Sequence, residues 1–333
     1  TLSYRPRMKE RINLNIKVDS IVPYNLNLQE KSGNTFSFTL NGNQNNFGNN
    51  KSLTTVKIDN FTISKDNDKK KIRNIYICDD YSREQHILLI NSDEIDCNII
   101  GNFKYQTLVK SLDGIFTRHL TGKHTIEEAF PGNNFIFNID IRRTDILSNI
   151  LSLPVIISGP STVNGELKDK SGEMALKANI NNANIAGSKY KTIGITGYGN
   201  KEIVAIDIQA NRLSKNSNGK DSKNDNIYIS VGSTLSNGSI SNKITWNSDK
   251  ERKIKGTLRF DADVSTTNDG QINILGTIHP DKIVHNDSLW HVSTCNISGN
   301  SKRLEIEGFS LYNDSHTRQV ISLDNTRLVA NTN

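Results

Sequence analysis

Histidine and acidic residues are the side chains of this sequence that could bind a metal ion. No two histidines have the HxxxH or HxH spacing of a metal site. The seven are His86, His119, His124, His279, His285, His291 and His316. In "HNDSLWH", His285, Asp287 and His291 are close in sequence, but an Asn-Asp-Ser turn separates the two histidines. A polar turn beside Trp290 is the favoured interpretation, so we predict no metal site and no cofactor.

Side chains that could catalyse a reaction are also poorly arranged. Asp79 and Asp80 are adjacent in "CDDY", and neighbouring residues of a strand point to opposite faces, so these carboxylates cannot converge on one atom. The sequence has no Ser/His/Asp order, GxSxG elbow, P-loop or GxGxxG motif. We therefore predict no catalytic residue and no enzyme.

The three cysteines do not form a recognisable site. Cys78, Cys97 and Cys295 are odd in number and have no CxxC spacing, so they signal neither a disulfide framework nor a zinc site. Cys78 and Cys97 lie in strands that we expect to be adjacent. Two reduced thiols are favoured there over a bond between them.

Charge gives no strong sign of a polyanionic partner. The net charge is +6, but Lys and Arg are scattered among Asp and Glu. The densest basic run, Lys69 to Lys71 with Arg73, follows "DND" at an expected hairpin tip. A solvated turn beside a strand edge explains it better than a patch for nucleic acid or anionic lipid. We predict no nucleic-acid partner.

Strands supply most of the elements that would position these residues. In "GTLRFDADVSTTNDGQINILGTIHP", Leu258, Phe260, Ala262 and Val264 alternate with polar residues, so one face of the strand is apolar. The same alternation recurs in short segments along most of the chain, with turn signals such as "KSGN" and "KDNDKKK" between them. The sequence predicts an all-β dominated fold.

Two segments interrupt the strands with helical spacing. The first, "YQTLVKSLDGIFTRHL", predicts a helix with an apolar face. That face comprises Leu108, Leu112, Ile115, Phe116 and Leu120. The second, "RRTDILSNILSLP", predicts a short helix that begins at the N-cap Thr144 and ends before Pro154. Its apolar face comprises Ile146, Leu147, Ile150 and Leu151.

The expected organisation has three parts. Residues 1–104 form an N-terminal β-meander, residues 105–154 a helix-containing insertion, and residues 155–333 a continuous one-faced β segment. Two short helices cannot cover so much apolar sheet surface. A two-sheet sandwich and an elongated, curled antiparallel or mixed sheet with a groove are the two arrangements left open. No stretch is long and apolar enough to cross a bilayer, so the chain is either soluble or a piece of a longer protein.

The C-terminal half carries the succession "IHP…IVHNDSLWHV…LEIEGFSLYNDSHTRQVIS". It resembles the TamB-like translocation and assembly module proteins, which are related to AsmA-like proteins, in the form found in Bacteroidota. The matching positions are Pro280, Asn286, Asp287, Ser288, Trp290, Phe309 and Leu311. Upstream, "LLINSDEIDCNIIGNFKYQTL" and "NNFIFNIDIRRTDILSNIL" also look like that family. The resemblance extends from about residue 50 onward.

The resemblance implies an internal fragment of a periplasmic cell-envelope protein that an N-terminal helix, absent here, anchors in the inner membrane. It implies a long curled sheet whose hydrophobic groove carries phospholipid between the inner and outer membranes. It also implies a role in outer-membrane protein assembly with a BamA- or TamA-type barrel partner, through regions absent here. The alternative is a surface adhesin or carbohydrate-binding β-sandwich, which would need an exposed aromatic platform.

With this family in view, the apolar strand positions become candidates for lining the groove. Each of them is otherwise an ordinary core position between packed sheets. The candidates are Leu167, Met174, Leu176, Ile180, Leu258, Phe260, Val264, Ile272, Ile274, Ile278, Leu304 and Ile306.

Overall fold

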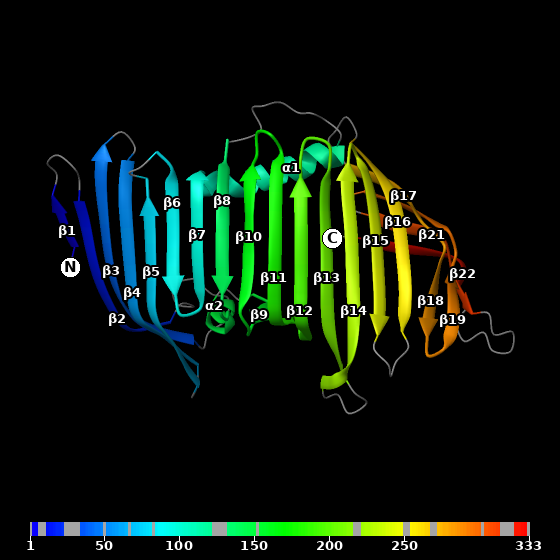
Figure 1. The fold of residues 1–333 in the computed structure, drawn as a ribbon, viewed down its shortest axis with the longest axis horizontal. Coiled ribbons are helices and arrows are strands. Elements are labelled where there is room, and N and C mark those ends of the chain that lie inside the picture. Colours follow the sequence, from blue (N-terminus) through cyan, green and yellow to red (C-terminus); the bar gives the residue numbers. More distant parts are fainter. Residues whose placement is uncertain are drawn as a thin grey trace. The chain divides into compact units, whose positions relative to one another are not determined.

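The computed structural model describes residues 2–5, 11–22, 34–48, 51–65, 68–81, 84–121, 132–150, 153–215, 221–248, 254–266, 272–300, 303–313 and 323–331. Its strands belong to one sheet, accompanied by two α-helices (Figure 1). The predicted all-β fold with two short helices is confirmed. The strand pairs whose register is defined are antiparallel, with no parallel pair among them in the described residues.

The chain divides into two compact units, which are described separately. Unit 1 comprises residues 1–104, 134–166 and 180–186, and unit 2 comprises residues 105–133, 167–179 and 187–333. The segment 105–154 is therefore shared between the units. Among the described residues, neither unit contains a helix that combines the length and apolar character needed to cross a bilayer.

Unit 1 is a meander of strands with one short helix, α2 (Asp145–Ile150). From β1 to β8, each strand pairs with the next along the chain. Its strands are β1 (Leu2–Arg5), β2 (Arg11–Ile21), β3 (Asn34–Gly48), β4 (Lys51–Lys65), β5 (Asp68–Asp80), β6 (His86–Ser92), β7 (Ile95–Asn102), β8 (Asn134–Ile141) and β9 (Val155–Ile157), with parts of β10 (Ser161–Lys168) and β11 (Glu173–Ile185). One expectation is corrected here: β6 lies between the strands of Cys78 and Cys97, so these strands are not adjacent. The basic run follows the tip of the β4–β5 hairpin, as expected, but Lys70 is half-buried and pairs with Asp145 at 3.0 Å.

Helix α2 packs against the sheet of unit 1 and begins directly after Thr144, as predicted, but the Thr144 side chain does not cap it. Ile146, 1% exposed, forms a core cluster with Ile63 and Ile72, as its predicted apolar position requires. The Thr144 hydroxyl accepts a hydrogen bond from the Ile157 amide at 2.9 Å, not from the first turn of the helix. The cap is instead Glu94, whose carboxylate oxygens accept hydrogen bonds from the amides of residues 146 and 147 at 3.3 and 3.2 Å.

Glu94 also makes the stability of unit 1 depend on pH. Burial raises the pKa of its carboxyl above 4.5, and hydrogen bonds from the Leu147 and Ile146 amides oppose that rise. The native state therefore keeps this proton to a higher pH than the unfolded chain does. The contribution of Glu94 to the free energy of unfolding is therefore complete below the pKa that Glu94 has in the unfolded chain. It is lost as the pH rises through the pKa that Glu94 has in the folded protein. We expect the unfolding free energy of wild type, relative to Glu94→Gln, to fall as pH rises above 4.5. Urea titrations at a series of pH values measure this difference, and a pH-independent difference would contradict the assignment.

Unit 2 contains the longer helix and the C-terminal strands. A 3₁₀ turn (Tyr105–Thr107) leads into α1 (Leu108–Thr121). The strands are β12 (Ser188–Gly199), β13 (Val204–Lys215), β14 (Asp221–Ser236), β15 (Ser239–Ser248), β16 (Lys255–Thr266), β17 (Ile272–Ile278), β18 (Asp281–His285), β19 (Ser288–Val292), β20 (Cys295–Asn300), β21 (Arg303–Asn313) and β22 (Leu323–Asn331), with the remaining parts of β10 and β11. From β12 to β17, consecutive strands pair. The β18–β19 hairpin pairs with β16 through β18 and with β21 through β19. The strands β17 and β20 pair with each other and also lie between β16 and β21.

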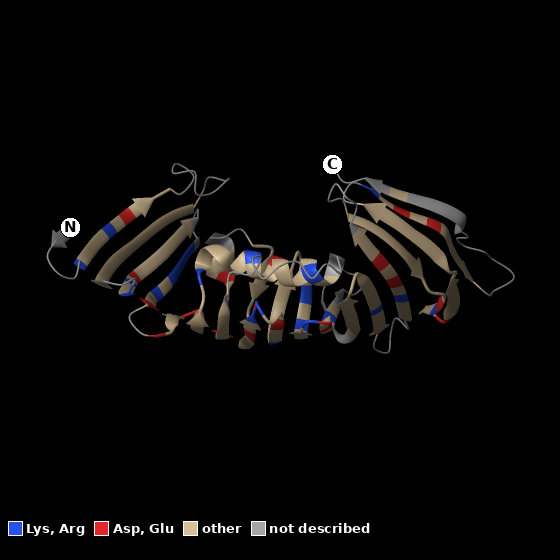
Figure 2. Cartoon of the chain, turned by 90° about the horizontal axis from the view of Figure 1, so that it is seen from above, with Lys and Arg blue, Asp and Glu red and all other residues tan. Residues whose placement is uncertain are grey.

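Helix α1 lies over one face of the sheet of unit 2 (Figure 2). It contacts β14, β15 and β16. At the ends of these strands, Leu235 and Val264 are buried, whereas Thr234 and Asp263 on the other face are exposed. The helix therefore covers one end of the side of the sheet that carries Leu235 and Val264. At its C-terminal end, the carbonyl of residue 119 accepts a hydrogen bond from the Gly238 amide in the β14–β15 turn at 2.6 Å.

The buried side of α1 differs from the predicted stripe. Ile115 is fully buried, as predicted, but Leu112 is 44% exposed. Ser111 and His119 are buried on the same side of the helix as Ile115, because residues four apart share one side of a helix. The predicted buried side differs from the observed one because the prediction uses only apolar residues. Polar side chains that form hydrogen bonds inside the protein can also be buried. The side chain of Leu120 lies outside the described residues, as do those of Ile150 and Leu151 in the second helical segment.

Candidate functional site

Strand register places the predicted groove residues of the C-terminal part on one face of unit 2. Val264 is opposite Ile274, and Phe260 is opposite Ile278. Ile274 is in turn opposite Gly299, which is opposite Leu304. Because side chains two residues apart share a face, all eight candidates from β16, β17 and β21 lie on this one face. They are Leu258, Phe260, Val264, Ile272, Ile274, Ile278, Leu304 and Ile306.

The same face continues across the preceding strands of unit 2. Ile195, Ile208, Val231, Ile244 and Leu258 form one cross-strand row over β12 to β16, each residue opposite the next. All five are aliphatic. We call the surface built from these rows the apolar face.

Two of the candidates from β11 also lie on the apolar face. A Cβ atom at Gly199 would come within 2.7 Å of the Met174 side chain, and one at Gly197 would lie 3.5 Å from the Leu176 Cβ. These two glycines are opposite Val204 and Ile206, which belong to the rows of the apolar face. The two remaining candidates differ from this group. Leu167 is buried at the unit 2 end of β10, and Ile180 is half-buried in unit 1.

Much of the apolar face is only half covered. Exposure along β15 alternates between exposed and intermediate residues, without the buried residues that a second packed sheet would produce. Ile272 and Leu304 remain 38% and 42% exposed. In the strands that the structure describes, a surface of this kind stays accessible to an apolar ligand.

One region of the apolar face is closed by the protein itself. Ile278, Val292 and Cys295 form a buried cluster, and partly buried neighbours pack against it. Four of the predicted lining residues belong to this packed group: Leu258, Phe260, Ile278 and Ile306. Nearby, the Trp246 ring lies over Gly256, where a Cβ atom would come within 2.3 Å of it. These residues form a core region that borders the more exposed positions.

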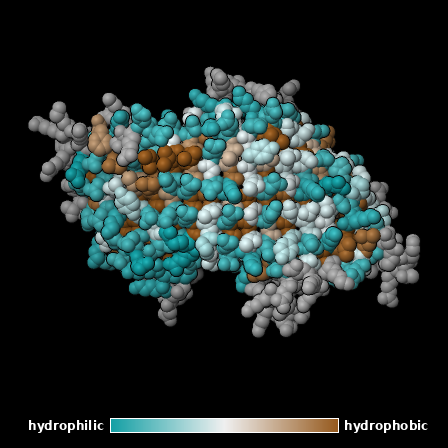
Figure 3. All heavy atoms as spheres, in the orientation of Figure 1, coloured by the Kyte–Doolittle hydropathy of each residue, from teal (hydrophilic) through white to brown (hydrophobic). Residues whose placement is uncertain are grey.

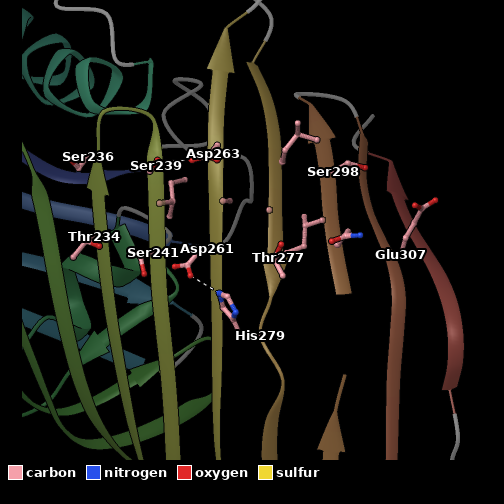
Figure 4. A pocket seen from close by; sticks show the side chains of 16 residues that line it. Thr234, Ser236, Ser239, Ser241, Asp261, Asp263, Thr277, His279, Ser298 and Glu307 are labelled. Atoms are coloured by element: carbon pink, nitrogen blue, oxygen red, sulfur yellow. Dashed lines mark hydrogen bonds and ion pairs between the residues drawn. The ribbon is translucent and has the colours of Figure 1, made fainter. Parts of the chain in front are cut away.

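The opposite face of the same strands carries polar side chains around an open hollow, which we call the polar trough. Its volume is about 790 Å³. The side chains form two cross-strand rows (Figure 4). In register, the first row is Thr234, Ser241, Asp261, Thr277, Asn296 and Glu307. The second row is Ser236, Ser239, Asp263, Leu275 and Ser298.

Hydrogen bonds hold the carboxylates of the trough in place. Asp261 lies 2.6 Å from the His279 ring nitrogen Nε2, and the Ser239 hydroxyl donates to Asp263 at 2.6 Å. Hydrogen bonds from the Ser241 hydroxyl and from His279 lower the pKa of Asp261. Asp261 is therefore ionised at neutral pH. Figure 3 shows that hydrophilic residues predominate on one face of the molecule, with hydrophobic residues visible between them.

From the sequence, the trough residues are predictable only as the polar side of their strands. The alternation of Arg259, Asp261 and Asp263 with apolar residues was the available signal, but it does not reveal which strands will be neighbours. Two buried polar clusters also have no signal in the local sequence. Both connect residues that are far apart in the sequence.

The first cluster surrounds Asp169, which follows β10 in unit 2 and is fully buried. Its Oδ2 accepts hydrogen bonds from the Ser111 hydroxyl of α1 at 2.7 Å and from the Gly132 and Asn133 amides at 3.2 and 2.9 Å. The Asn133 side chain donates to Ser111 at 2.6 Å and to Thr107 at 3.0 Å. Asp169 thus ties the start of α1 to the strand that enters the β10–β11 turn.

The second cluster surrounds His86 in unit 1. The His86 ring, on a residue that is 4% exposed, stacks between Tyr81 and Phe103 at centroid distances of 3.6 and 3.8 Å. Its Nε2 lies 2.5 Å from Asp79, and its Nδ1 lies 3.2 Å from the Phe103 carbonyl. The Asp79 of "CDDY" is therefore a partner of a buried histidine. A neutral imidazole can donate to only one of these two oxygens.

The other residues considered from the sequence do not form a metal site in the described residues. His285, Asn286 and Asp287 lie at the β18–β19 turn, where residues 286 and 287 have φ values of 49° and 62°. This is the polar turn that the sequence predicts. No group of three or more His, Cys, Asp or Glu side chains within the described part of the chain could hold a metal ion. The three cysteines are free.

Comparisons of the chain with protein-family models, with curated proteins and with solved structures found no match.

Proposed function

We propose that the apolar face binds the acyl chains of phospholipids and shields them from water during transport between membranes. The observation that carries this proposal is the in-register apolar face of unit 2, whose strands remain half-exposed where α1 and the packed cluster do not cover them. Burial of a methylene group is worth about 0.8 kcal/mol, so an acyl chain of about fifteen methylenes gains on the order of 12 kcal/mol on leaving water. Aliphatic side chains suffice for this task.

The resemblance to TamB-like proteins supports the wider setting of the proposal. In that setting the chain is part of a periplasmic envelope protein anchored in the inner membrane, and it also assists outer-membrane protein assembly with a BamA- or TamA-type barrel. The lipid is the ligand, and no catalytic step is required because its transfer breaks no bond.

The alternative function is that of a surface adhesin or carbohydrate-binding β-sandwich, and the structure of the apolar face supports it less than it supports lipid binding. It calls for two packed sheets, whereas the strands described here belong to one sheet. In the form expected from the sequence it also calls for an exposed aromatic platform on the binding face, and on the apolar face the Trp246 ring lies over Gly256.

Charges placed on the exposed part of the apolar face should remove bound lipid. We choose Ile272→Asp with Leu304→Asp, because both side chains are over one third exposed and tolerate a polar replacement better than the packed cluster does. Phospholipid that copurifies with the chain, measured by extraction and mass spectrometry, should decrease about fivefold or more because the carboxylates must be desolvated beside the acyl chain.

The matched control is Thr257→Asp with Asn273→Asp, which adds the same charges to β16 and β17 on the opposite face. This control should retain the lipid of the wild type. Lipid-free wild-type protein would overturn the proposal. An equal lipid content in the two double variants, with folding confirmed by circular dichroism, would overturn it as well.

A further inference from the structure

The polar trough has a regular geometry that the proposed lipid function does not use. Its first row crosses six strands, from β14 to β21, and its second row crosses the first five of them, with neighbouring strands about 4.8 Å apart. The first row therefore extends over roughly 24 Å, as five strand spacings require. A repetitive array of this length suits an extended chain molecule with a similar repeat.

The chemistry of the lining restricts the class of ligand. Hydroxyl groups predominate, from Thr234, Ser241 and Thr277 in the first row and from the three serines of the second. The carboxylates are Asp261, Asp263 and Glu307, and the lining contains no lysine or arginine among the residues that the structure describes. The nearest lysine and arginine on this face, Lys243 and Arg259, lie in the adjacent row beyond Ser241 and Asp261. The carboxylates of the lining itself disfavour an anionic ligand. The lining offers hydrogen-bond acceptors and donors to a neutral ligand that carries many hydroxyl groups.

Leu275 is the apolar residue of the two rows, and Ile240, Ala262 and Ile297 also line the hollow at positions between the rows. Leu275 is 65% exposed, and it lies in the second row between Asp263 and Ser298. A sugar ring presents a polar rim of hydroxyl groups and a less polar face of C–H groups. A leucine flanked by a carboxylate and a hydroxyl group matches both surfaces of such a ring.

We propose that the polar trough binds a linear, uncharged oligosaccharide, which lies across the strands with its sugar rings following the strand spacing. Asp261 and Asp263 accept hydrogen bonds from sugar hydroxyl groups, and Leu275 contacts the C–H face of one ring. Because Ser239 and Ser241 already hold these two carboxylates, little side-chain freedom is lost on binding. The trough and the apolar face are on opposite sides of the same strands, so either proposal can fail without the other.

The test is calorimetric titration of the whole chain with tetra- to hexasaccharides of the cello-, malto- and chito-oligosaccharide series. We expect saturable binding of at least one series, with affinity rising with the number of sugar units. Asp263→Asn should weaken that binding about tenfold, since a neutral amide replaces the charged acceptor and one of the two acceptor oxygens becomes a donor group. Asp207→Asn is the matched control, because Asp207 is exposed on the same face in β13 and outside the trough.

Three results would overturn the proposal. One is the absence of saturable binding for all three series. Another is equal weakening by the two asparagine variants. The third is saturable binding of hexalysine together with no binding of any oligosaccharide, which would assign the trough to a cationic peptide. The phospholipid content of Asp263→Asn should equal that of wild type, which separates this test from the test of the apolar face.

Discussion

Replacement of Asp169 by alanine should lower the free energy of unfolding of unit 2 by about 3 kcal/mol or more. The variant removes the buried carboxylate that accepts hydrogen bonds from the Ser111 hydroxyl and from the Gly132 and Asn133 amides. The Ser111 hydroxyl keeps the Thr107 carbonyl as an acceptor at 3.2 Å, so the two amides bear most of the loss. Each donor that is left without a partner keeps its desolvation cost. The start of α1 should loosen from the β10–β11 hairpin.

Urea denaturation followed by tryptophan fluorescence measures this effect. The sequence has two tryptophans, Trp246 and Trp290, and both lie in unit 2. The control is Asp113→Ala on the exposed side of α1, which should change the unfolding free energy by less than about 0.5 kcal/mol. Equal midpoints for the two variants would show that Asp169 is not a structural anchor.

Replacement of His86 by alanine should destabilise the β5–β7 region of unit 1 by about 3 kcal/mol or more, the usual cost of truncating a buried ring. The variant removes the ring stacked between Tyr81 and Phe103 and leaves the Phe103 carbonyl without its contact to Nδ1. His86→Phe keeps the stack but loses both polar contacts, so its effect should be smaller.

Hydrogen exchange of peptides from β5, β6 and β7 reports this region directly, because exchange follows local opening. Faster exchange should be confined to unit 1 in the His86 variants. His285→Ala, at an exposed position at the end of β18, serves as the control. Unchanged exchange in the β5–β7 peptides of His86→Ala would contradict the proposed role of the ring.

The apolar face could be predicted from the sequence because the alternation of side chains is a local property. Each strand shows its own period of two, so Phe260 and Val264 can be assigned to one side without knowledge of their neighbours. Helix spacing is local in the same way, so the sequence predicts both helices. The predicted stripe of α1 nevertheless included the exposed Leu112 and omitted Ser111, since the partner of Ser111 is Asp169, 58 residues away.

Contacts between distant segments were decided only by the tertiary structure. Glu94 caps a helix that begins about fifty residues later, and nothing near Thr144 in the sequence indicates this. The two rows of the polar trough exist only because six strands pair in one particular register. A shift of one residue in any pairing would move that strand's polar side chains to the other face. The sequence thus determines which side of each strand is apolar, whereas strand pairing decides which side chains become neighbours, because the hydrogen bonds that set the register join segments that no local pattern connects.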